Sequence, residues 1–152
     1  MRFESLSKDH NRADFDCGST PLNLFLQTTA RSHQKRGVSK TTILVGESDT
    51  TILGFFTLCA SEINSTKLPP ALSKTYPDRI GIIRLCRLAV DANYQGQGLG
   101  SILIHEAIRI TVETSDLVGV TGMIVDAKDN SAAGFYKQYG FAEVLTNPLT
   151  LF

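Results

Sequence analysis

A short glycine-rich segment, Gln95–Gly100, carries the clearest chemical signal in the sequence. It follows an apolar stretch from Leu85 to Val90 and precedes a helical pattern that begins near Leu99. A glycine-rich turn between a strand and a helix presents several backbone N–H groups together at the positive end of the helix dipole, and this arrangement suits an anionic phosphate. The segment therefore predicts a phosphate-binding turn.

The spacing of the glycines separates this turn from two other phosphate-binding motifs. A P-loop needs Lys and Ser or Thr after its last glycine, whereas Ser101 follows Gly100 with no lysine. The dinucleotide fingerprint G-x-G-x-x-G does not match Gly96, Gly98 and Gly100 either. The segment fits Q-x-x-G-x-G, with Gln95 as its first residue, in which glycines let the main chain approach a pyrophosphate. On spacing alone, an ordinary glycine-rich turn is an equal alternative.

A second set of candidate residues, Asn130-x-x-Ala133-x-x-Tyr136, follows one helix and one strand later. Tyr136 carries a phenol that can donate a proton, although an aromatic side chain at a helix edge more often serves packing. Asn130 could contact a ligand or cap the helix, a role that Ser131 could also fill. Spacing alone does not decide between these roles.

Composition narrows the class of protein. The 152 residues suit one domain, and 15 basic against 15 acidic side chains argue against a surface coated in positive charge for nucleic acid. A local basic run nevertheless contains Arg31, His33, Lys35, Arg36 and Lys40. Such a run is usually a solvated helix end, and it is also what a phosphate-contacting patch needs.

The cysteines and the apolar stretches indicate the cellular compartment of the protein. Cys17, Cys59 and Cys86 lie far apart and lack C-x-x-C spacing, which argues against a disulfide framework and a zinc site. Two of them lie in apolar, strand-like stretches, so we expect buried thiols in a reducing cytoplasm. No apolar run approaches the length of a membrane span, and the first eleven residues are too polar for a secretory signal.

The elements that must position these residues interleave along the chain. A helix should begin at Ser19 or Thr20 and end before Gly37, and Gly54 should mark a bulge or a close backbone approach. The other expected helices start at Leu99 and cover Ala132–Tyr139, and the expected strands are Thr41–Val45, Ile52–Leu58, Ile80–Val90, Val120–Val125 and Phe141–Leu145. A final strand over 149–152 should be frayed or completed by a neighbouring molecule. The pattern predicts a single α/β (α+β) domain over residues 1–152.

Three motifs in order resemble the GNAT family of acetyl-CoA-dependent N-acetyltransferases. They are Arg87-Leu88-Ala89-Val90-Asp91, the Gln95–Gly100 turn, and Asn130-x-x-Ala133-x-x-Tyr136-x-x-x-Gly140-Phe141. The resemblance covers about Ile80 to Val144. It implies the GNAT fold, a mixed, mostly antiparallel central sheet flanked by helices.

The resemblance also implies a role for each motif. The strand Leu88–Val90 would pair with the pantetheine arm, and one of its N–H groups would hold the oxyanion of the tetrahedral intermediate. Tyr136 would lie beside the thioester sulfur as the general acid for the leaving thiolate. The implied acetyl-CoA-binding residues are Leu88, Ala89, Val90, Gln95, Gly96, Gln97, Gly98, Leu99, Gly100, Asn130, Ala133 and Phe135.

The first half of the chain is similar to one branch of that family. Phe15-x-Cys17-Gly18, Phe25-Leu26 leading to Gln34, and Leu68-Pro69-x-x-Leu72 resemble the GNAT toxins of bacterial toxin–antitoxin pairs. Members of that branch acetylate the α-amino group of aminoacyl-tRNA, which blocks translation, and each is paired with a ribbon-helix-helix antitoxin. The resemblance also implies a homodimer. The candidate tRNA contacts are Arg31, Lys35, Arg36, Arg84, Arg87 and Lys137.

Two other functions fit the same sequence. A GNAT enzyme acting on a small amine or a protein N-terminus suits the zero net charge. A catalytically silent CoA-binding module is the third possibility. The presence of both Tyr136 and an intact Gln95–Gly100 turn argues against it. No cluster of His, Cys or carboxylate residues points to a metal.

Overall fold

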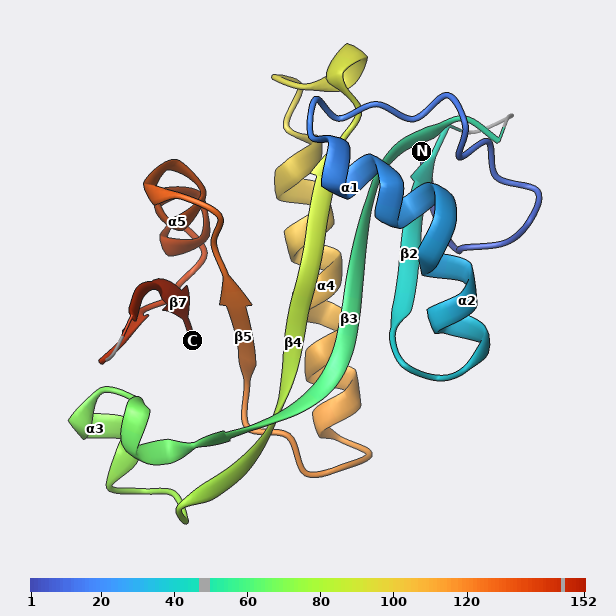
Figure 1. The fold of residues 1–152 in the computed structure, drawn as a ribbon. Coiled ribbons are helices and arrows are strands. Elements are labelled where there is room, and N and C mark those ends of the chain that lie inside the picture. The colour runs from blue at the N-terminus through green and yellow to red at the C-terminus, as the bar shows by residue number, and fades with distance from the viewer. Residues whose placement is uncertain (47–49, 146) are drawn as a thin grey trace. The chain divides into compact units, whose positions relative to one another are not determined.

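The computed structural model of the chain describes residues 1–46, 50–145 and 147–152. The middle of the polar loop expected between the first two predicted strands therefore lies outside the described residues. Within these described residues, seven strands are hydrogen-bonded as neighbours in the order β1-β2-β3-β4-β5-β7-β6 (Figure 1). Their pairing is mostly antiparallel, and β4 with β5 is a parallel pair. The predicted mixed sheet flanked by helices is confirmed.

The chain divides into two compact units. The first consists of Met1–Cys59 and Cys86–Arg109, and the second consists of Ala60–Leu85 and Ile110–Phe152. The strands are β1 (Arg2–Ser5), β2 (Lys40–Val45), β3 (Ile52–Asn64), β4 (Arg79–Val90), β5 (Met123–Asp126), β6 (Glu143–Val144) and β7 (Asn147–Leu151). The helical segments are α1 (Thr20–Leu24), η1 (Phe25–Thr29), α2 (Ala30–Lys35), η2 (Ser65–Lys67), α3 (Pro70–Ser73), η3 (Ala92–Tyr94), α4 (Leu99–Ser115) and α5 (Asn130–Lys137).

The first unit packs helices on its strands. The predicted N-terminal helix is a continuous run of α1, η1 and α2, with Ser19 as N-cap, Pro21 in the first turn, and Gly37 after its end at φ 74°. Its middle turn, η1, is π-helical rather than α-helical. Leu22, Phe25, Leu26 and Ala30 recur at helical spacing in this run, and the last three are buried while Leu22 is half-buried. In Figure 1 this run lies in front of the strands of the first unit.

Gly54, on β3 of the same unit, packs tightly against β4 and α4. A Cβ atom at this position would lie 2.9 Å from the carbonyl oxygen of Ala89 and 2.9 Å from Cδ1 of Leu103 in α4. There is thus no room for a side chain, and the expected close backbone approach at Gly54 is confirmed. The buried apolar positions of α4 are Leu99, Leu103, Ile104 and Ala107, and the polar Thr111 is buried as well.

The second unit has its own small core. It contains Leu68, Ile80, Ile82, Ile124 and Val144. The parallel register of β4 and β5 pairs Ile83 with Met123 and Leu85 with Val125.

Several predicted boundaries differ from the structure. β1 was not anticipated, because its short, half-exposed sequence lacks an apolar run. β3 continues to Asn64, because its second half alternates between half-buried and exposed residues rather than ending at the polar side chains. The expected strands over 120–125 and 141–145 shorten to β5 and β6. The last strand is not left unpaired, since β7 pairs with both β5 and β6. No helix in the described part of the chain is long and apolar enough to cross a membrane.

Candidate active site

The glycine-rich turn connects β4 to α4 within the first unit. β4 ends at Val90, η3 follows, and α4 begins at Leu99. Gly96 and Gly98 have φ angles of 79° and 80°, in the left-handed region that favours glycine. A Cβ atom would meet nothing within 4 Å at either position, so the requirement for glycine is conformational and not steric. The turn therefore requires glycine at these two positions because of their backbone conformation.

The side chain of Gln95 holds this turn in place. Its amide nitrogen donates hydrogen bonds to the carbonyl oxygens of Val90 at 2.9 Å and Cys17 at 3.1 Å. The first bond closes the turn after β4, and the second ties it to the segment that precedes α1. Part of the Gln95 side chain is thus committed to positioning the turn, which leaves the main chain of Gly96–Gly100 as the candidate anion-binding surface.

Asp91, a buried residue that is 5% exposed, supports the same turn. Its carboxylate accepts a hydrogen bond from the backbone N–H of Asn93 at 2.9 Å, which caps η3, and another from the N–H of Asp16 at 3.1 Å. The pKa of Asp16 is itself lowered, first by the backbone N–H of Gly18 and then by the side chain of Asn23. These two hydrogen bonds hold the Asp91 carboxylate against the main chain, so Asp91 shapes the turn.

The turn fits an anionic group. The first N–H groups of a helix have no acceptor within the helix, and α4 has 17 residues with no acidic side chain in its first turn. The glycine backbone before it leaves the approach to those N–H groups free of side chains at Gly96 and Gly98. Phosphate of a CoA-type molecule is a ligand that this donor set can hold.

Tyr136 lies in the second unit, on α5. Its side chain is 8% exposed and packs against the rings of Phe135 and Phe141, with centroid distances of 5.2 and 6.0 Å. Burial raises the pKa of Tyr136 to about 12. The phenol therefore stays protonated at neutral pH, which is the state that a general acid requires.

Asn130 does not cap α5. The N-cap is Asp129, whose carboxylate accepts a hydrogen bond from the N–H of Ala132 at 2.8 Å. The alternatives in which Asn130 or Ser131 caps the helix are thus wrong, because the helix begins earlier than predicted. Asn130 is the exposed first residue of α5, and Ala133 is buried while Phe135 is half-buried. α5 ends at Lys137, and the chain turns away from it through Gly140, which has a φ of 95°.

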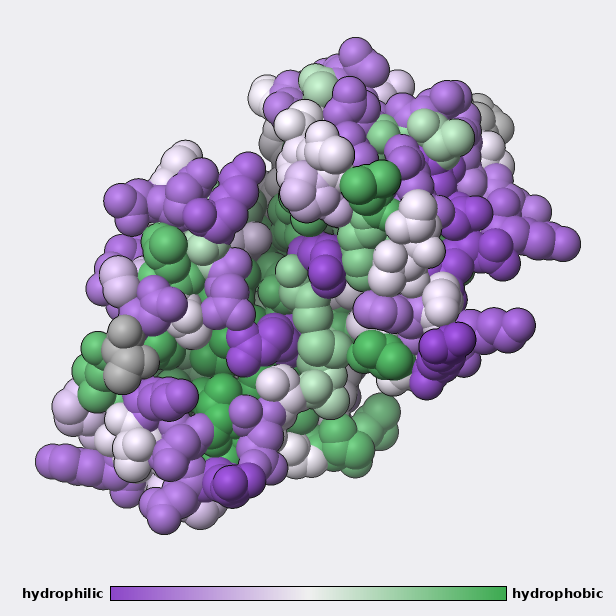
Figure 2. Space-filling view, viewed as in Figure 1, coloured by the Kyte–Doolittle hydropathy of each residue, from purple (hydrophilic) through white to green (hydrophobic). Residues whose placement is uncertain are grey.

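The candidate tRNA contacts differ in their surroundings. Arg31, Lys35 and Arg36 are exposed on and directly after α2, and no described carboxylate forms an ion pair with them. Arg84 pairs with Asp126, and Lys137 pairs with Glu143 at 2.6 Å. Figure 2 shows hydrophilic surface around the end of α2. Arg31, Lys35 and Arg36, which we call the α2 group, are thus available to contact phosphate. Arg84 and Lys137 already have carboxylate partners.

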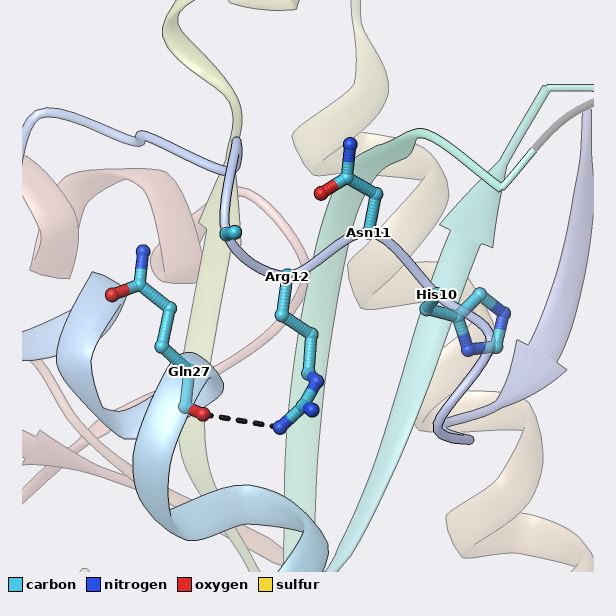
Figure 3. Close-up of a pocket in the computed structure, with 5 residues that line it drawn as sticks. His10, Asn11, Arg12 and Gln27 are labelled. Atoms are coloured by element: carbon cyan, nitrogen blue, oxygen red, sulfur yellow. Dashed lines mark hydrogen bonds between the residues drawn. The ribbon is translucent and has the colours of Figure 1, made fainter.

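One hollow of the first unit was missed by sequence reasoning. His10, Asn11, Arg12, Ala13 and Gln27 line an open pocket between the segment after β1 and η1 (Figure 3). Arg12 donates a hydrogen bond from Nη1 to the carbonyl oxygen of Gln27 at 3.0 Å. His10 is buried, and its Nε2 atom lies 2.9 Å from Oε1 of Glu4. No local pattern signals the pocket, because Gln27 on η1 is distant in sequence from the other lining residues.

Comparison with known proteins gives one family and several close likenesses. The family described as acetyltransferase (GNAT) domain matches residues 39–143. A protein of Mycobacterium tuberculosis named as a tRNA-acetylating toxin is 32% identical over 137 residues, 90% of this chain and 81% of that protein. The structure of AtaT complexed with acetyl-methionyl-tRNAfMet is similar with a TM-score of 0.93 and 34% identity, over 99% of this chain and 92% of that one. A mutant AtaT toxin bound to the C-terminus of the antitoxin AtaR and acetyl-CoA gives a TM-score of 0.82 and 32% identity, over 99% and 90%.

Proposed function

Because the chain belongs to the GNAT family of acetyltransferases, we propose that it transfers the acetyl group of acetyl-CoA to the α-amino group of an aminoacyl-tRNA and so blocks translation as a toxin. The observation that carries this proposal is the likeness over 99% of the chain to AtaT in complex with an acetylated aminoacyl-tRNA. The protein from Mycobacterium tuberculosis supports the same acceptor, since its name describes that reaction.

The first unit supplies the residues proposed to bind acetyl-CoA. The main chain of Gly96–Gly100, with the first turn of α4 behind it, would hold the pyrophosphate, and Gln95 would keep that turn in shape. The strand Leu88–Val90 would offer its main chain to the amide-rich arm and an N–H to the developing negative charge. Acetyl-CoA supplies an activated acetyl group as its thioester.

The second unit supplies the proposed proton donor. Tyr136 would protonate the departing sulfur, and its pKa of about 12 keeps that proton on the phenol at any physiological pH. Asn130, Ala133 and Phe135, on the same helix, would contact the acetyl-CoA molecule. Asp91 is not needed as a base, since its carboxylate is committed to backbone N–H groups.

The acceptor would be held through phosphate contacts. Arg31, Lys35 and Arg36 form a compact set of cations with no carboxylate partner among the described residues, and Arg87 adds a fourth cation in the first unit. Arg84 and Lys137 would have to exchange Asp126 and Glu143 for phosphate, so we expect smaller contributions from them.

The partners follow from the same proposal. We expect a cognate ribbon-helix-helix antitoxin to silence the enzyme, as the complex of AtaT with the C-terminus of AtaR suggests. We also expect a homodimer, a cytoplasmic location where charged tRNA is found, and a single catalytic domain. The family match supports the last point, since residues 39–143 draw on both units.

The test is an acetylation assay with a pair of tyrosine variants. Purified protein is incubated with labelled acetyl-CoA and charged tRNA, beside Tyr136→Phe and the neighbouring Tyr139→Phe. We expect label on the aminoacyl group with wild type and Tyr139→Phe, and a loss of about 10²- to 10⁴-fold with Tyr136→Phe. Uncharged tRNA should stay unlabelled, because it lacks the α-amino group.

Two outcomes would count against this function. If the protein binds acetyl-CoA but labels small amines or protein N-termini and not charged tRNA, then aminoacyl-tRNA is not the acceptor. Full activity of Tyr136→Phe would remove the proposed general acid while leaving the acceptor in place.

A further inference from the structure

The side chains of Cys59 and Cys86 meet although 27 positions separate them along the chain. Their sulfur atoms lie 3.0 Å apart, on the neighbouring strands β3 and β4. Both are half-buried thiols, and both belong to the first unit, so the contact is internal to it. We propose that this pair is an oxidation site, at which a peroxide converts the two thiols reversibly into a disulfide.

The geometry favours this pair as bonding partners. A disulfide has a sulfur–sulfur distance of about 2.05 Å, so the two atoms need to approach by only about 1 Å. Hydrogen bonding between β3 and β4 already fixes the two backbones beside each other. Side-chain rotation can therefore supply most of the movement, and neither strand has to leave the sheet.

The chemistry balances with one peroxide molecule. The thiolate of one cysteine attacks a peroxide oxygen, the O–O bond breaks, and a sulfenic acid and one water form. The second thiolate then attacks the sulfenic sulfur, the S–O bond breaks, and a second water leaves. Two thiols lose two electrons and two protons in total, and hydrogen peroxide is reduced to two water molecules.

Because both cysteines are half-buried, a small peroxide can reach their sulfur atoms although they are less exposed than surface thiols. A small peroxide can approach a partly exposed sulfur, whereas a fully buried one is inert. Disulfides in reducing compartments are usually transient, so we expect thiol reductants to restore the pair. The expectation of buried thiols is corrected, since all three cysteines are half-buried, and the sulfur atoms of two of them lie in contact.

Cys17 is the natural comparison within the same unit. It is also half-buried, and its sulfur lies 3.7 Å from the carbonyl oxygen of Ser19 in its own turn. Its surroundings offer a hydrogen-bond acceptor and not a second thiol at the distance of the Cys59–Cys86 pair. Cys17 should therefore remain alkylatable after mild oxidation.

The experiment treats the purified full chain with hydrogen peroxide, removes the oxidant, and alkylates the remaining thiols under denaturing conditions. Intact mass should show two of the three thiols consumed, with the loss of two hydrogens and no added oxygen. A non-reducing digest should yield one linked pair of peptides, containing Cys59 and Cys86. Dithiothreitol should return all three thiols.

Matched variants make the result decisive. Cys17→Ser should still form the link, whereas Cys59→Ala and Cys86→Ala should not. Because the link closes a long loop of the unfolded chain, it should also raise the melting temperature of the oxidised wild type, by roughly 10 °C. Links that involve Cys17, equal oxidation of all three thiols, or three intact thiols would each overturn the proposal. The assay uses no acetyl-CoA, so its outcome is independent of the enzymatic function.

Discussion

The guanidinium carbon of Arg87 lies 3.7 Å from the centre of the Phe25 ring. Arg87 belongs to β4, and Phe25 opens the π-helical turn η1 and is only 5% exposed. The ring is part of an aromatic group that includes Phe55, stacked at 6.5 Å, and His33 at 6.0 Å. A cation over a buried ring has a fixed position, so Arg87 is oriented before any acceptor binds.

We predict a measurable coupling between these two residues. Phe25→Leu keeps an apolar side chain but removes the ring face, and Arg87→Gln removes the cation. A double-mutant cycle in urea should give a coupling free energy of about 0.5–2 kcal/mol. Phe25→Leu should also lower kcat/KM for charged tRNA several-fold, with KM for acetyl-CoA unchanged. Strict additivity of the two stability changes would show that the contact contributes nothing.

The α2 group should control salt dependence without controlling stability. Replacing Arg31, Lys35 and Arg36 by Gln removes cations with no carboxylate partner in the described chain, so the free energy of unfolding should change by at most about 0.5 kcal/mol for each. The salt slope of tRNA binding should fall by about one for each lost phosphate contact. Binding of charged tRNA measured over a range of salt concentrations tests this.

The control for the α2 group is a pair of cations that already have partners. Arg84→Gln and Lys137→Gln remove side chains paired with Asp126 and Glu143, and they should change the salt slope less. An unchanged slope in the α2 variant would place the acceptor elsewhere on the molecule.

Tyr136 should titrate later than an ordinary tyrosine. Burial raises its pKa from 10.0 to about 12, so the folded state holds the proton more tightly than the unfolded state. The stabilising contribution is therefore complete below pH 10 and is lost as the pH rises through 12, by about 3 kcal/mol in total. Urea unfolding above pH 10 should show a steeper decline for wild type than for Tyr136→Phe.

The same shift fixes the shape of the rate profile. The rate should rise with pH as the acceptor amine loses its proton, because only the neutral amine is nucleophilic. Ionisation of Tyr136 should cause no fall in the rate below about pH 11, since its pKa is about 12. A descending limb near neutral pH that disappears in Tyr136→Phe would contradict this assignment.

Gly98 should be replaceable by asparagine but not by alanine. Its φ of 80° costs an alanine about 1–2 kcal/mol, whereas Asn tolerates this region better, and neither side chain would clash within 4 Å at Cβ. Gly98→Ala should therefore weaken acetyl-CoA binding, measured by calorimetry, more than Gly98→Asn. Equal affinities for both variants would show that the left-handed backbone of this turn is not required.

The local elements and the chemistry of their side chains could be predicted from the amino-acid sequence. The turn at Gln95–Gly100 could be predicted because glycine tolerates a positive φ, and Gly96 and Gly98 both adopt one. Gly140, after α5, also has a positive φ. The buried face of the N-terminal helix followed from its spacing, and the family could be identified because its motifs are short and ordered. These signals depend on neighbours within a few residues, so they can be read along the chain.

The contacts between separate elements, in contrast, came from the three-dimensional fold. It placed Arg87 on Phe25, set Cys86 beside Cys59, and paired Arg84 with Asp126, 42 positions away. It also gave Gln95 its carbonyl partners. Such contacts depend on strand order and register, which bring distant residues together without any local pattern in the sequence. The chemistry of each side chain was therefore predictable, but its partner was not.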